Sequence, residues 1–333
     1  MIGNGFDINI GLKTRYTEFY QHYVGKYPDD MLAQAIGKNH IYWSDLELGL
    51  GRYTEQIKPE EEEVFWNSEA NLEQELANYL ESQLDLVKIN DADKRTEIAL
   101  EMQRSLIEFS KELPENFKEQ INNILGAIRE NITYSFISFN YTTVLDQCLD
   151  IAKKIFQNSI GKRSFNGGLI YSDNIGDVIH IHGTTETEMV LGVNDEEQIS
   201  NKNFSKNNFY RQLLIKEETI KRYNTVKNEN AYRYIDDSII ICVFGMSIGR
   251  TDKRWWQYIC KWLQEDDTRL LIIYEKINQE KWISKYTLFA HQDEMMNRLK
   301  NNADLTDDAW EQIKKQIHVK CNPNIFNFNI LGK

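Results

Sequence analysis

The sequence predicts an α/β fold in which a mainly parallel sheet is covered by helices on both faces. From about residue 133 onward, short apolar segments of strand length alternate with segments of helical period, including 143–156 and 252–264. Such alternation is typical of a parallel sheet buried on both sides. The predicted strands are 134–139, 178–181, 189–193, 239–244 and 270–274.

The region from about 28 to 132 is instead predicted as a large helical insertion. Its apolar residues recur at helical spacing in three stripes, which begin near Phe65, Ile98 and Phe117. This spacing is typical of helices that bury one face in a core. A second segment, about 196–235, is polar and rich in Asn and Lys, and we predict an insertion or flexible loop there. Both would interrupt one domain spanning 1–333.

Composition narrows the classes of partner. The 333 residues carry 39 Lys and Arg against 51 Asp and Glu, a net charge of −12, which disfavours a nucleic acid partner. The sequence contains neither a run of about 20 apolar residues nor a signal peptide pattern, so we expect a cytoplasmic protein without a membrane partner. Its four cysteines are scattered without a Cys-x-x-Cys pair, which indicates free thiols.

Glycine- or polar-marked turns follow four candidate parallel strands, one of which is the short apolar start Met1-Ile2. In an open α/β sheet, ligands bind outside the carboxyl ends of the strands, so the four turns together predict a site. The turns are Gly3-Asn4-Gly5 after Met1-Ile2, Asn140-Tyr141 after Phe139, His182-Gly183 after Ile181, and Gly245-Met246-Ser247 after Phe244.

The first two turns each allow a second interpretation. Gly3 and Gly5 would let the backbone approach a phosphate at a helix N-terminus. However, Ile8 occupies the position of the third glycine of the dinucleotide fingerprint, and an ordinary tight turn explains the pair equally well. Asn140 could hold a water or a ribose hydroxyl through its amide, or cap the helix that follows.

The other two turns also carry ionisable or hydroxyl groups. Histidine titrates near neutrality, so His182 is a candidate general base, whereas we expect His180 to be a packed polar residue. A metal site is not predicted, because no Cys or acidic residue stands near the two histidines at suitable spacing. Ser247 and Asp252 could bind ligand hydroxyls or cap the next helix.

The motifs, taken together and in order, resemble the bacteriophage abortive-infection AbiH family. The resemblance extends from the first residues to about 260. Its motifs are Ile2-Gly3-Asn4-Gly5-Phe6-Asp7, Gly11-Leu12-Lys13-Thr14, Trp43-Ser44-Asp45-Leu46-Glu47, Phe139-Asn140-Tyr141-Thr142, His180-Ile181-His182-Gly183, Leu191-Gly192-Val193 and Phe244-Gly245-Met246-Ser247 with Thr251-Asp252.

The AbiH pattern is more distantly similar to the sirtuin-like NAD-consuming domains of other anti-phage systems. This similarity implies a Rossmann-like sheet in which Asn140 and His182 form the catalytic pair. By the same implication, Asp7 and Asp252 would contact the ribose or position other groups. The residues implied to line the NAD site are Gly3, Asn4, Gly5, Tyr141, Gly183, Gly245 and Ser247.

Three departures from the sirtuin-like pattern matter. Thr142 stands where that pattern has an Asp, so a carboxylate is either missing or supplied from elsewhere in the chain. The four-cysteine zinc module is absent, which argues against a protein deacetylase. The first strand, Met1-Ile2, has only two residues, which suggests that a few upstream residues are missing.

The resemblance implies an anti-phage enzyme that cleaves the nicotinamide–ribose bond of NAD and needs no metal. One alternative is a sensor module that binds NAD or ADP-ribose without cleaving it. Another is a toxin that targets RNA or interacts with a protein, for which the polar segment would be the contact. As further partners we consider a second copy of the chain or a phage-derived trigger protein.

Overall fold

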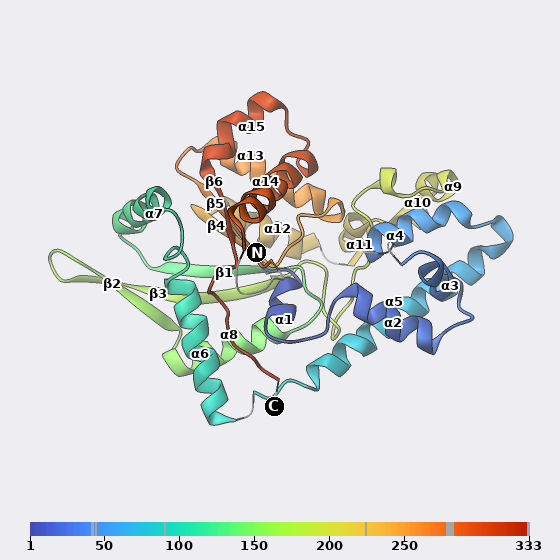
Figure 1. The fold of residues 1–333 in the computed structure, drawn as a ribbon, viewed down its shortest axis with the longest axis horizontal. Helices are drawn as coiled ribbons and strands as arrows, with labels where there is room; N and C mark the ends of the chain where they lie inside the picture. Colours follow the sequence, from blue (N-terminus) through green and yellow to red (C-terminus); the bar gives the residue numbers. More distant parts are fainter. Residues whose placement is uncertain (41–42, 44, 90, 224, 278–282, 332–333) are drawn as a thin grey trace.

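The computed structural model describes residues 1–333 except 41–42, 44, 90, 224, 278–282 and 332–333, and it shows a mixed α/β fold (Figure 1). The strands form two three-stranded sheets, ordered β1-β3-β2 and β4-β5-β6, in which only the β2–β3 pair is antiparallel. They are β1 (Ile132–Ser138), β2 (Ser159–Phe165), β3 (Leu169–His180), β4 (Ile240–Phe244), β5 (Leu270–Glu275) and β6 (Ile317–Cys321).

Residues 1–3, the central segment, lie between β1 and β4 and join the two sheets. Ile2 forms parallel bridges to Ser138 on one side and to Phe244 on the other. Its N–H donates to the Ile137 carbonyl at 2.9 Å, and the Gly3 N–H donates to the Phe244 carbonyl at 2.9 Å. The combined order is therefore β2-β3-β1-central segment-β4-β5-β6.

Helices cover both faces of this sheet, as the sequence predicts. In β5, Leu270 and Ile272 belong to the core on one face, and Leu271 and Ile273 to the core on the other. Figure 1 shows α6 and α8 on one side and α13 to α15 on the opposite side. The covering helices are α1 (Gly5–Asn9), α6 (Ala92–Ile107), α7 (Glu115–Ala127) and α8 (Val144–Phe156) on the first face, and α12 (Thr225–Asp236), α13 (Lys253–Glu265), α14 (Lys285–Asn302) and α15 (Asp307–Ile313) on the second.

The remaining helices form a lobe beside the sheet, which we call the helical lobe. Trp66 stacks on Phe204 with ring centroids 5.7 Å apart, and Tyr210 packs against both rings. Two segments distant in sequence therefore share one core. The helices of the lobe are α2 (Tyr16–Lys26), α3 (Met31–Lys38), α4 (Leu46–Tyr53), α5 (Glu62–Leu84), α9 (Lys202–Lys206), α10 (Asn208–Leu214) and α11 (Lys216–Tyr223). Short 3₁₀ helices connect several elements, at Thr54–Gln56, Pro59–Glu61, Glu196–Gln198, Arg250–Asp252 and Lys314–Gln316.

Two expectations about the second half of the chain are wrong. The polar segment 196–235 is not a flexible loop: its described residues form several helices, and Asn201 and Asn207 accept backbone N–H bonds at the starts of α9 and α10. That the segment is an insertion stays a prediction. The predicted strand at 189–193 is not a strand, and only Val193 makes an isolated bridge, to Ile215. Its apolar side chains are buried against the helical lobe, and a short apolar run does not distinguish a strand from such a buried connection.

The first half differs from expectation in one respect. The helical region 28–132 does not act as a single insertion, because α3 to α5 belong to the helical lobe whereas α6 and α7 pack on the sheet. The predicted strand 178–181 corresponds to the end of β3, whereas the earlier part of β3, the strand β2 and the edge strand β6 are not indicated by the periodicity.

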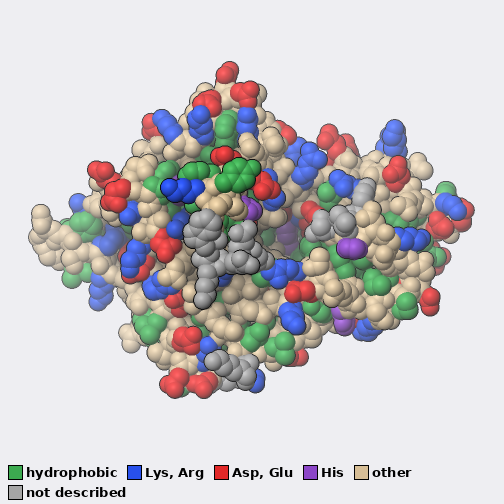
Figure 2. All heavy atoms as spheres, in the orientation of Figure 1, with side chains coloured by type: hydrophobic (Ala, Val, Ile, Leu, Met, Phe, Trp, Pro, Cys, Tyr) green, Lys and Arg blue, Asp and Glu red, His purple; other side chains and the backbone are tan. Residues whose placement is uncertain are grey.

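The surface and the cysteines bear on the predicted partners. Figure 2 shows acidic and basic side chains interspersed over the face in view, without a broad area of either sign. Among the described helices, none combines the length and apolar composition that crossing a membrane requires. Cys148, Cys242, Cys260 and Cys321 are all free thiols.

Candidate functional site

The glycines of the first and last turns meet at the carboxyl ends of the central segment and β4. The Gly5 N–H donates to the Gly245 carbonyl at 2.8 Å. A Cβ built on Gly5 would lie 2.4 Å from the Cα of Gly245, and one on Gly245 would lie 2.6 Å from the Cα of Gly5. Gly245 also has a φ of +70°, which favours glycine. Contact between two backbones therefore accounts for both residues.

The neighbouring amide side chain is engaged within the protein as well. Asn4 Nδ2 donates to the Thr14 carbonyl at 2.8 Å, and Asn4 Oδ1 accepts from the Thr14 hydroxyl at 2.5 Å. The Gly3 N–H is bonded to the Phe244 carbonyl. The prediction that Gly3, Asn4 and Gly5 bind NAD stays a prediction.

Asp7, Asn140 and Thr142 form a buried cluster, here named the Asp7 group. Asp7, only 1% exposed, accepts hydrogen bonds from Asn140 Nδ2 at 3.1 Å and from the Thr142 hydroxyl at 2.6 Å. Burial raises the pKa of Asp7 to about 7, although both hydrogen bonds act in the opposite direction. This carboxyl therefore gains and loses its proton near neutral pH.

The Asp7 group resolves two alternatives from the sequence. The Thr142 hydroxyl donates to Asp7, so a carboxylate from another part of the chain lies beside Thr142. Asn140 does not cap α8, whose N-cap residue is Thr143. Instead, the buried Asn140 Oδ1 accepts no hydrogen bond from any residue in the described part of the chain. Buried polar atoms are usually paired, so this oxygen suits a ligand or water that donates a hydrogen bond.

A second cluster, here named the Lys216 network, comprises Tyr141, Glu47, Lys216, Asp252 and His182. The buried Lys216 Nζ lies 2.8 Å from Glu47 Oε2 and 2.9 Å from Asp252 Oδ1. The Tyr141 hydroxyl donates to Glu47 Oε1 at 3.2 Å, and His182 Nε2 lies 3.5 Å from Asp252 Oδ1. Glu47 in α4 and Lys216 at the start of α11 come from the helical lobe, so the network joins that lobe to the sheet edge.

Charge in the Lys216 network is set by burial and by mutual pairing. Burial disfavours the Lys216 ammonium, but Asp252 and Glu47 outweigh it, so the pKa of Lys216 is raised. Burial likewise opposes the charge of Asp252, yet Lys216 holds its pKa below the ordinary value. Burial raises the pKa of Glu47 to about 7, with Lys216 acting against it. Burial, followed by Lys216, lowers the pKa of His182 to about 3.

These values change the expected role of His182. An imidazole with a pKa of about 3 is neutral at physiological pH but accepts a proton weakly. General bases work best with a pKa near the operating pH, so Asp7 and Glu47 match that requirement more closely. His180 is a packed polar residue, as predicted: its ring nitrogens contact the Asn140 carbonyl at 2.9 Å and Asp146 Oδ2 at 2.8 Å.

The other predicted residues differ in how they relate to these groups. Asp252 is the N-cap residue of α13 without a side-chain cap bond, since its carboxylate contacts Lys216. Gly183 follows His182 with a φ of +74°, which allows the close turn there. Ser247 is exposed and belongs to neither group; its carbonyl accepts from Arg298 Nη1 at 3.3 Å.

Sequence reasoning assigned no role to Lys216 or Glu47. Glu47 lies in the Trp43–Glu47 motif of the resemblance, of which Ser44 is outside the described residues, so that motif was the available signal. Lys216 is one of several lysines in a polar segment, and only its burial distinguishes it. The described residues contain no group of three or more His, Cys, Asp or Glu side chains that could hold a metal ion.

The fold and the two buried groups define a class: a mixed α/β protein that gathers ionisable side chains at the carboxyl ends of parallel strands. Residues 1–274 match the family model described as bacteriophage abortive infection AbiH. The chain therefore belongs to the AbiH family, and this membership indicates a role in abortive infection, a defence against bacteriophage. Neither a curated protein nor a solved structure matches it.

Proposed function

We propose that this AbiH protein is an NAD glycohydrolase, which cleaves the nicotinamide–ribose bond and depletes NAD during infection. The observation that carries the proposal is the Asp7 group. There a buried amide oxygen of Asn140 without a partner stands beside a carboxyl whose pKa is about 7. One group can hold a water or a ribose hydroxyl, and the other can accept a proton near neutral pH.

The strand order supports a Rossmann-like, sirtuin-like sheet for this site. Taking the central segment as the first strand, the six parallel strands run 3-2-1-4-5-6, where β1 is second, β3 third and β4 to β6 follow. This is the doubly wound order of dinucleotide-binding sheets, which bind their ligand where the order reverses. That point lies between the central segment and β4; Asp7 follows the central segment and contacts Asn140 and Thr142, which follow β1.

The proposed reaction adds water across one bond. The water oxygen bonds to the anomeric carbon of the ribose as the bond to the nicotinamide nitrogen breaks. The bonding electrons neutralise the pyridinium ring, so nicotinamide leaves without needing an acid. An oxocarbenium-like transition state, as in glycoside hydrolysis, is expected. The products are nicotinamide and ADP-ribose, and one proton from the water goes to a base.

Asp7 and His182 are the two candidates to accept the proton from the water, and Asn140 would orient that water. Asp7 is favoured because its pKa of about 7 suits a base at neutral pH. The neutral His182 ring would then orient the substrate by hydrogen bonding rather than take up the proton. A positioned base contributes about 10²–10⁴ in rate.

The Lys216 network would act as a closure between the helical lobe and the sheet edge. Tyr141, Glu47, Lys216 and His182 are each at least nine-tenths buried, so water has little access to this cluster. Glu47 and Lys216 both come from the lobe, whereas His182 and Asp252 follow strands β3 and β4. Movement of the lobe would separate the two sides, admit the dinucleotide and expose the site to a trigger.

The test is incubation of the purified chain with NAD, followed by chromatography of free nicotinamide. We expect release by the unaltered chain and its loss in Asn140→Ala and His182→Ala. The exposed Asn301 and the partly exposed His291, both on α14, provide matched controls as Asn301→Ala and His291→Ala. A thermal melt of every variant separates lost chemistry from lost folding.

The pH profile separates the two candidate bases. If Asp7 accepts the proton, the rate rises through a pKa near 7, and Asp7→Asn removes both the rise and the activity. A rate that is flat down to about pH 4 and survives in Asp7→Asn would assign the base to His182. Full activity in either His182→Ala or Asn140→Ala would overturn the assignment of the catalytic pair.

The alternative of a non-catalytic NAD or ADP-ribose sensor is favoured by one observation. The side chains of the Lys216 network are bonded to one another, as expected of a pocket that opens only to bind. For a sensor, NAD or ADP-ribose would raise the melting temperature without forming nicotinamide. If NAD neither forms nicotinamide nor raises the melting temperature, both the enzyme and the sensor proposals fail. An RNA-targeting or protein-interaction toxin then replaces them.

A further inference from the structure

His180, the last residue of β3, lies against the backbone of Asn140 in the Asp7 group, and its side chain is 9% exposed. His180 Nδ1 lies 2.9 Å from the Asn140 carbonyl oxygen, and His180 Nε2 lies 2.8 Å from Asp146 Oδ2 on α8. The ring therefore bridges the backbone of Asn140 and a carboxylate of the helix that follows it in the chain.

The two partners of the ring determine its charge. A carbonyl oxygen and an ionised carboxylate can only accept hydrogen bonds, and a neutral imidazole has only one N–H to donate. The second nitrogen of a neutral ring would therefore face an oxygen lone pair, whereas an imidazolium donates to both partners. Asp146 is 35% exposed, so water solvates its carboxylate form. Both contacts are satisfied together when a positively charged His180 pairs with an ionised Asp146.

The contact with His180 completes the set of bonds that hold Asn140. The Asn140 N–H donates to Ser138 Oγ at 3.2 Å, and its Nδ2 donates to Asp7 Oδ1 at 3.1 Å. Its carbonyl accepts from the His180 ring. Within the described residues, the side-chain Oδ1 is thus the one hydrogen-bonding group of Asn140 that has no partner. The direction of this oxygen depends on the three bonds that fix the rest of the residue.

The ionisable groups around the ring come from three elements: Asp146 on α8, Lys227 on α12 and Asp7 on α1. Burial acts to lower the pKa of His180, but Asp146 and the Asn140 carbonyl outweigh it, so the pKa is raised; Lys227 acts in the same direction as burial. Burial also dominates the raised pKa of Asp7, and the charge of His180 is one of the influences that oppose it. A change of charge at His180 therefore reaches Asp7.

We infer that His180, as an imidazolium paired with Asp146, is a positioning residue that fixes the Asn140 backbone and thereby directs the unpartnered Oδ1. A water or ligand that donates to this oxygen then binds in one orientation. The same positive charge favours the ionised form of the Asp7 carboxyl. The role of His180 in NAD cleavage rests on the proposed function, whereas its charge and its effect on Asp7 do not.

The charge of His180 is measured by ¹⁵N NMR of the chain labelled with ¹⁵N-histidine, with the His180 signals assigned through its backbone. At pH 7 we expect both ring nitrogens to be protonated. Asp146→Asn removes the paired charge, so His180 should lose its proton at a lower pH. Asp150→Asn is the matched control, because Asp150 is exposed on the same helix, and it should leave that pH unchanged. One unprotonated nitrogen at pH 7 in the unaltered chain would overturn the inference.

The effect on Asp7 is followed by ¹³C NMR of its carboxyl carbon, which Asp7→Asn assigns. His180→Gln keeps a side chain that donates hydrogen bonds but removes the charge, so Asp7 should titrate at a higher pH. His180→Lys restores a positive charge and should bring this pH part of the way back. An unchanged titration of Asp7 in His180→Gln would overturn the inference, whether or not the chain cleaves NAD. Where His180→Gln does not fold, the unaltered chain and Asp146→Asn still decide the charge.

Nicotinamide release measures the effect on catalysis. His180→Gln should lower kcat by roughly tenfold to a hundredfold with little change in KM, because Asn140 is misplaced rather than removed. The pH at which the rate rises should increase together with that of Asp7. A lowered kcat with an unmoved pH profile would show that His180 only packs the sheet, and the inference would be wrong. If the unaltered chain releases no nicotinamide, the proposed function fails, while the two NMR titrations still decide the charge of His180 and its effect on Asp7.

Discussion

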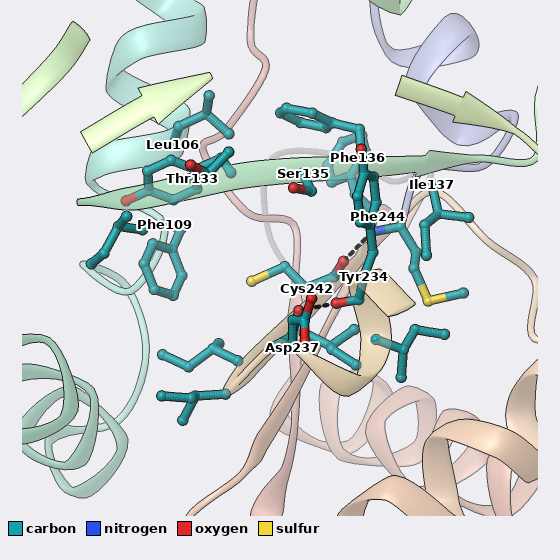
Figure 3. Close-up of a pocket in the computed structure, with 18 of the residues that line it drawn as sticks. Leu106, Phe109, Thr133, Ser135, Phe136, Ile137, Tyr234, Asp237, Cys242 and Phe244 are labelled. Atoms are coloured by element: carbon teal, nitrogen blue, oxygen red, sulfur yellow. Dashed lines mark hydrogen bonds between the residues drawn. The ribbon is translucent and has the colours of Figure 1, made fainter. Parts of the chain in front are cut away.

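The two ends of the same sheet are built in opposite ways. At the carboxyl ends, the turns touch backbone to backbone at Gly5 and Gly245, and buried ionisable side chains fill the space around them. At the amino ends, β1 and β4 extend beyond the central segment and border a cavity of about 530 Å³ (Figure 3). The comparison shows that residues 1–3 hold β1 and β4 together at the carboxyl ends, beside the buried ionisable groups.

The largest expected effect tests the backbone contact at the carboxyl end. We expect Gly5→Ala to cost roughly 4 kcal/mol or more of unfolding free energy, or to prevent folding, because its Cβ would meet the backbone of Gly245. Urea denaturation gives the measurement. Gly126→Ala is the control, because its Cβ meets nothing within 4 Å in α7, and it should stabilise by up to about 1 kcal/mol. Similar changes in unfolding free energy for the two variants would contradict a close backbone contact between Gly5 and Gly245.

Removing the cation of the Lys216 network is expected to have the next largest effect. Lys216→Met leaves the buried Glu47 and the partly buried Asp252 beside each other without their ammonium, at a cost of about 3–5 kcal/mol. Lys221→Met removes a lysine of α11 whose side chain is 62% exposed, and should change stability by less than about 1 kcal/mol. Urea denaturation of both variants at pH 7 gives the two changes in unfolding free energy. Equal, small decreases would show that the Lys216 network contributes little to stability.

A pH series tests the burial of Asp7. With a pKa near 7 in the folded chain, Asp7 keeps a proton that the unfolded chain releases near pH 4. Its contribution to stability therefore falls as pH rises from about 4 to about 7, by at most roughly 4 kcal/mol. His182, with its lowered pKa, acts in the opposite direction below about pH 6.5. The measurement is thus the difference in unfolding free energy between the unaltered chain and Asp7→Asn across this range, and a constant difference would mean that Asp7 is ionised throughout.

The smallest effect is expected at the amino end. Ile239 borders the cavity and is 40% exposed, so Ile239→Ala should cost less than about 1 kcal/mol. Ile273, on β5, is 1% exposed, and Ile273→Ala should cost about 2–5 kcal/mol. The urea midpoints of the two variants measure how much stability each side chain contributes, Ile239 at the amino end of the sheet and Ile273 in its packed interior. Equal costs would mean that the amino end is as tightly packed as the middle of the sheet.

The sequence predicted secondary structure most accurately where burial alone determines the residue pattern. Continuous apolar runs predicted β4 and β5, and helical spacing predicted α8 and α13 within one residue at each end. β6 was missed because His318 and Lys320 alternate with its buried residues, so the segment reads as polar. A half-buried edge strand has only this weak signal, whereas a strand buried on both faces has a continuous apolar run.

The candidate site was predicted in part for a similar reason. Turn position placed Asn140 and the Gly3-Asn4-Gly5 turn at the same sheet edge, and the family resemblance added Asp7, whose side chain lies 3.1 Å from that of Asn140. Lys216 could not be found in this way, because its partners Glu47 and Asp252 lie far from it along the chain. Whether a lysine is a solvated surface residue or a buried cation depends on contacts between distant segments. Local pattern carries no information about those contacts.

The central segment also imposes an order on events during synthesis. Its first residue bonds to a carbonyl 241 positions later, on β4. A ribosome that adds about 5–20 residues per second needs roughly 12–50 s to produce that partner. Until then the two half-sheets have no strand to join them, and β4 must capture a segment made about 240 residues earlier. Any molecule that holds the first residues during this interval would compete with folding itself.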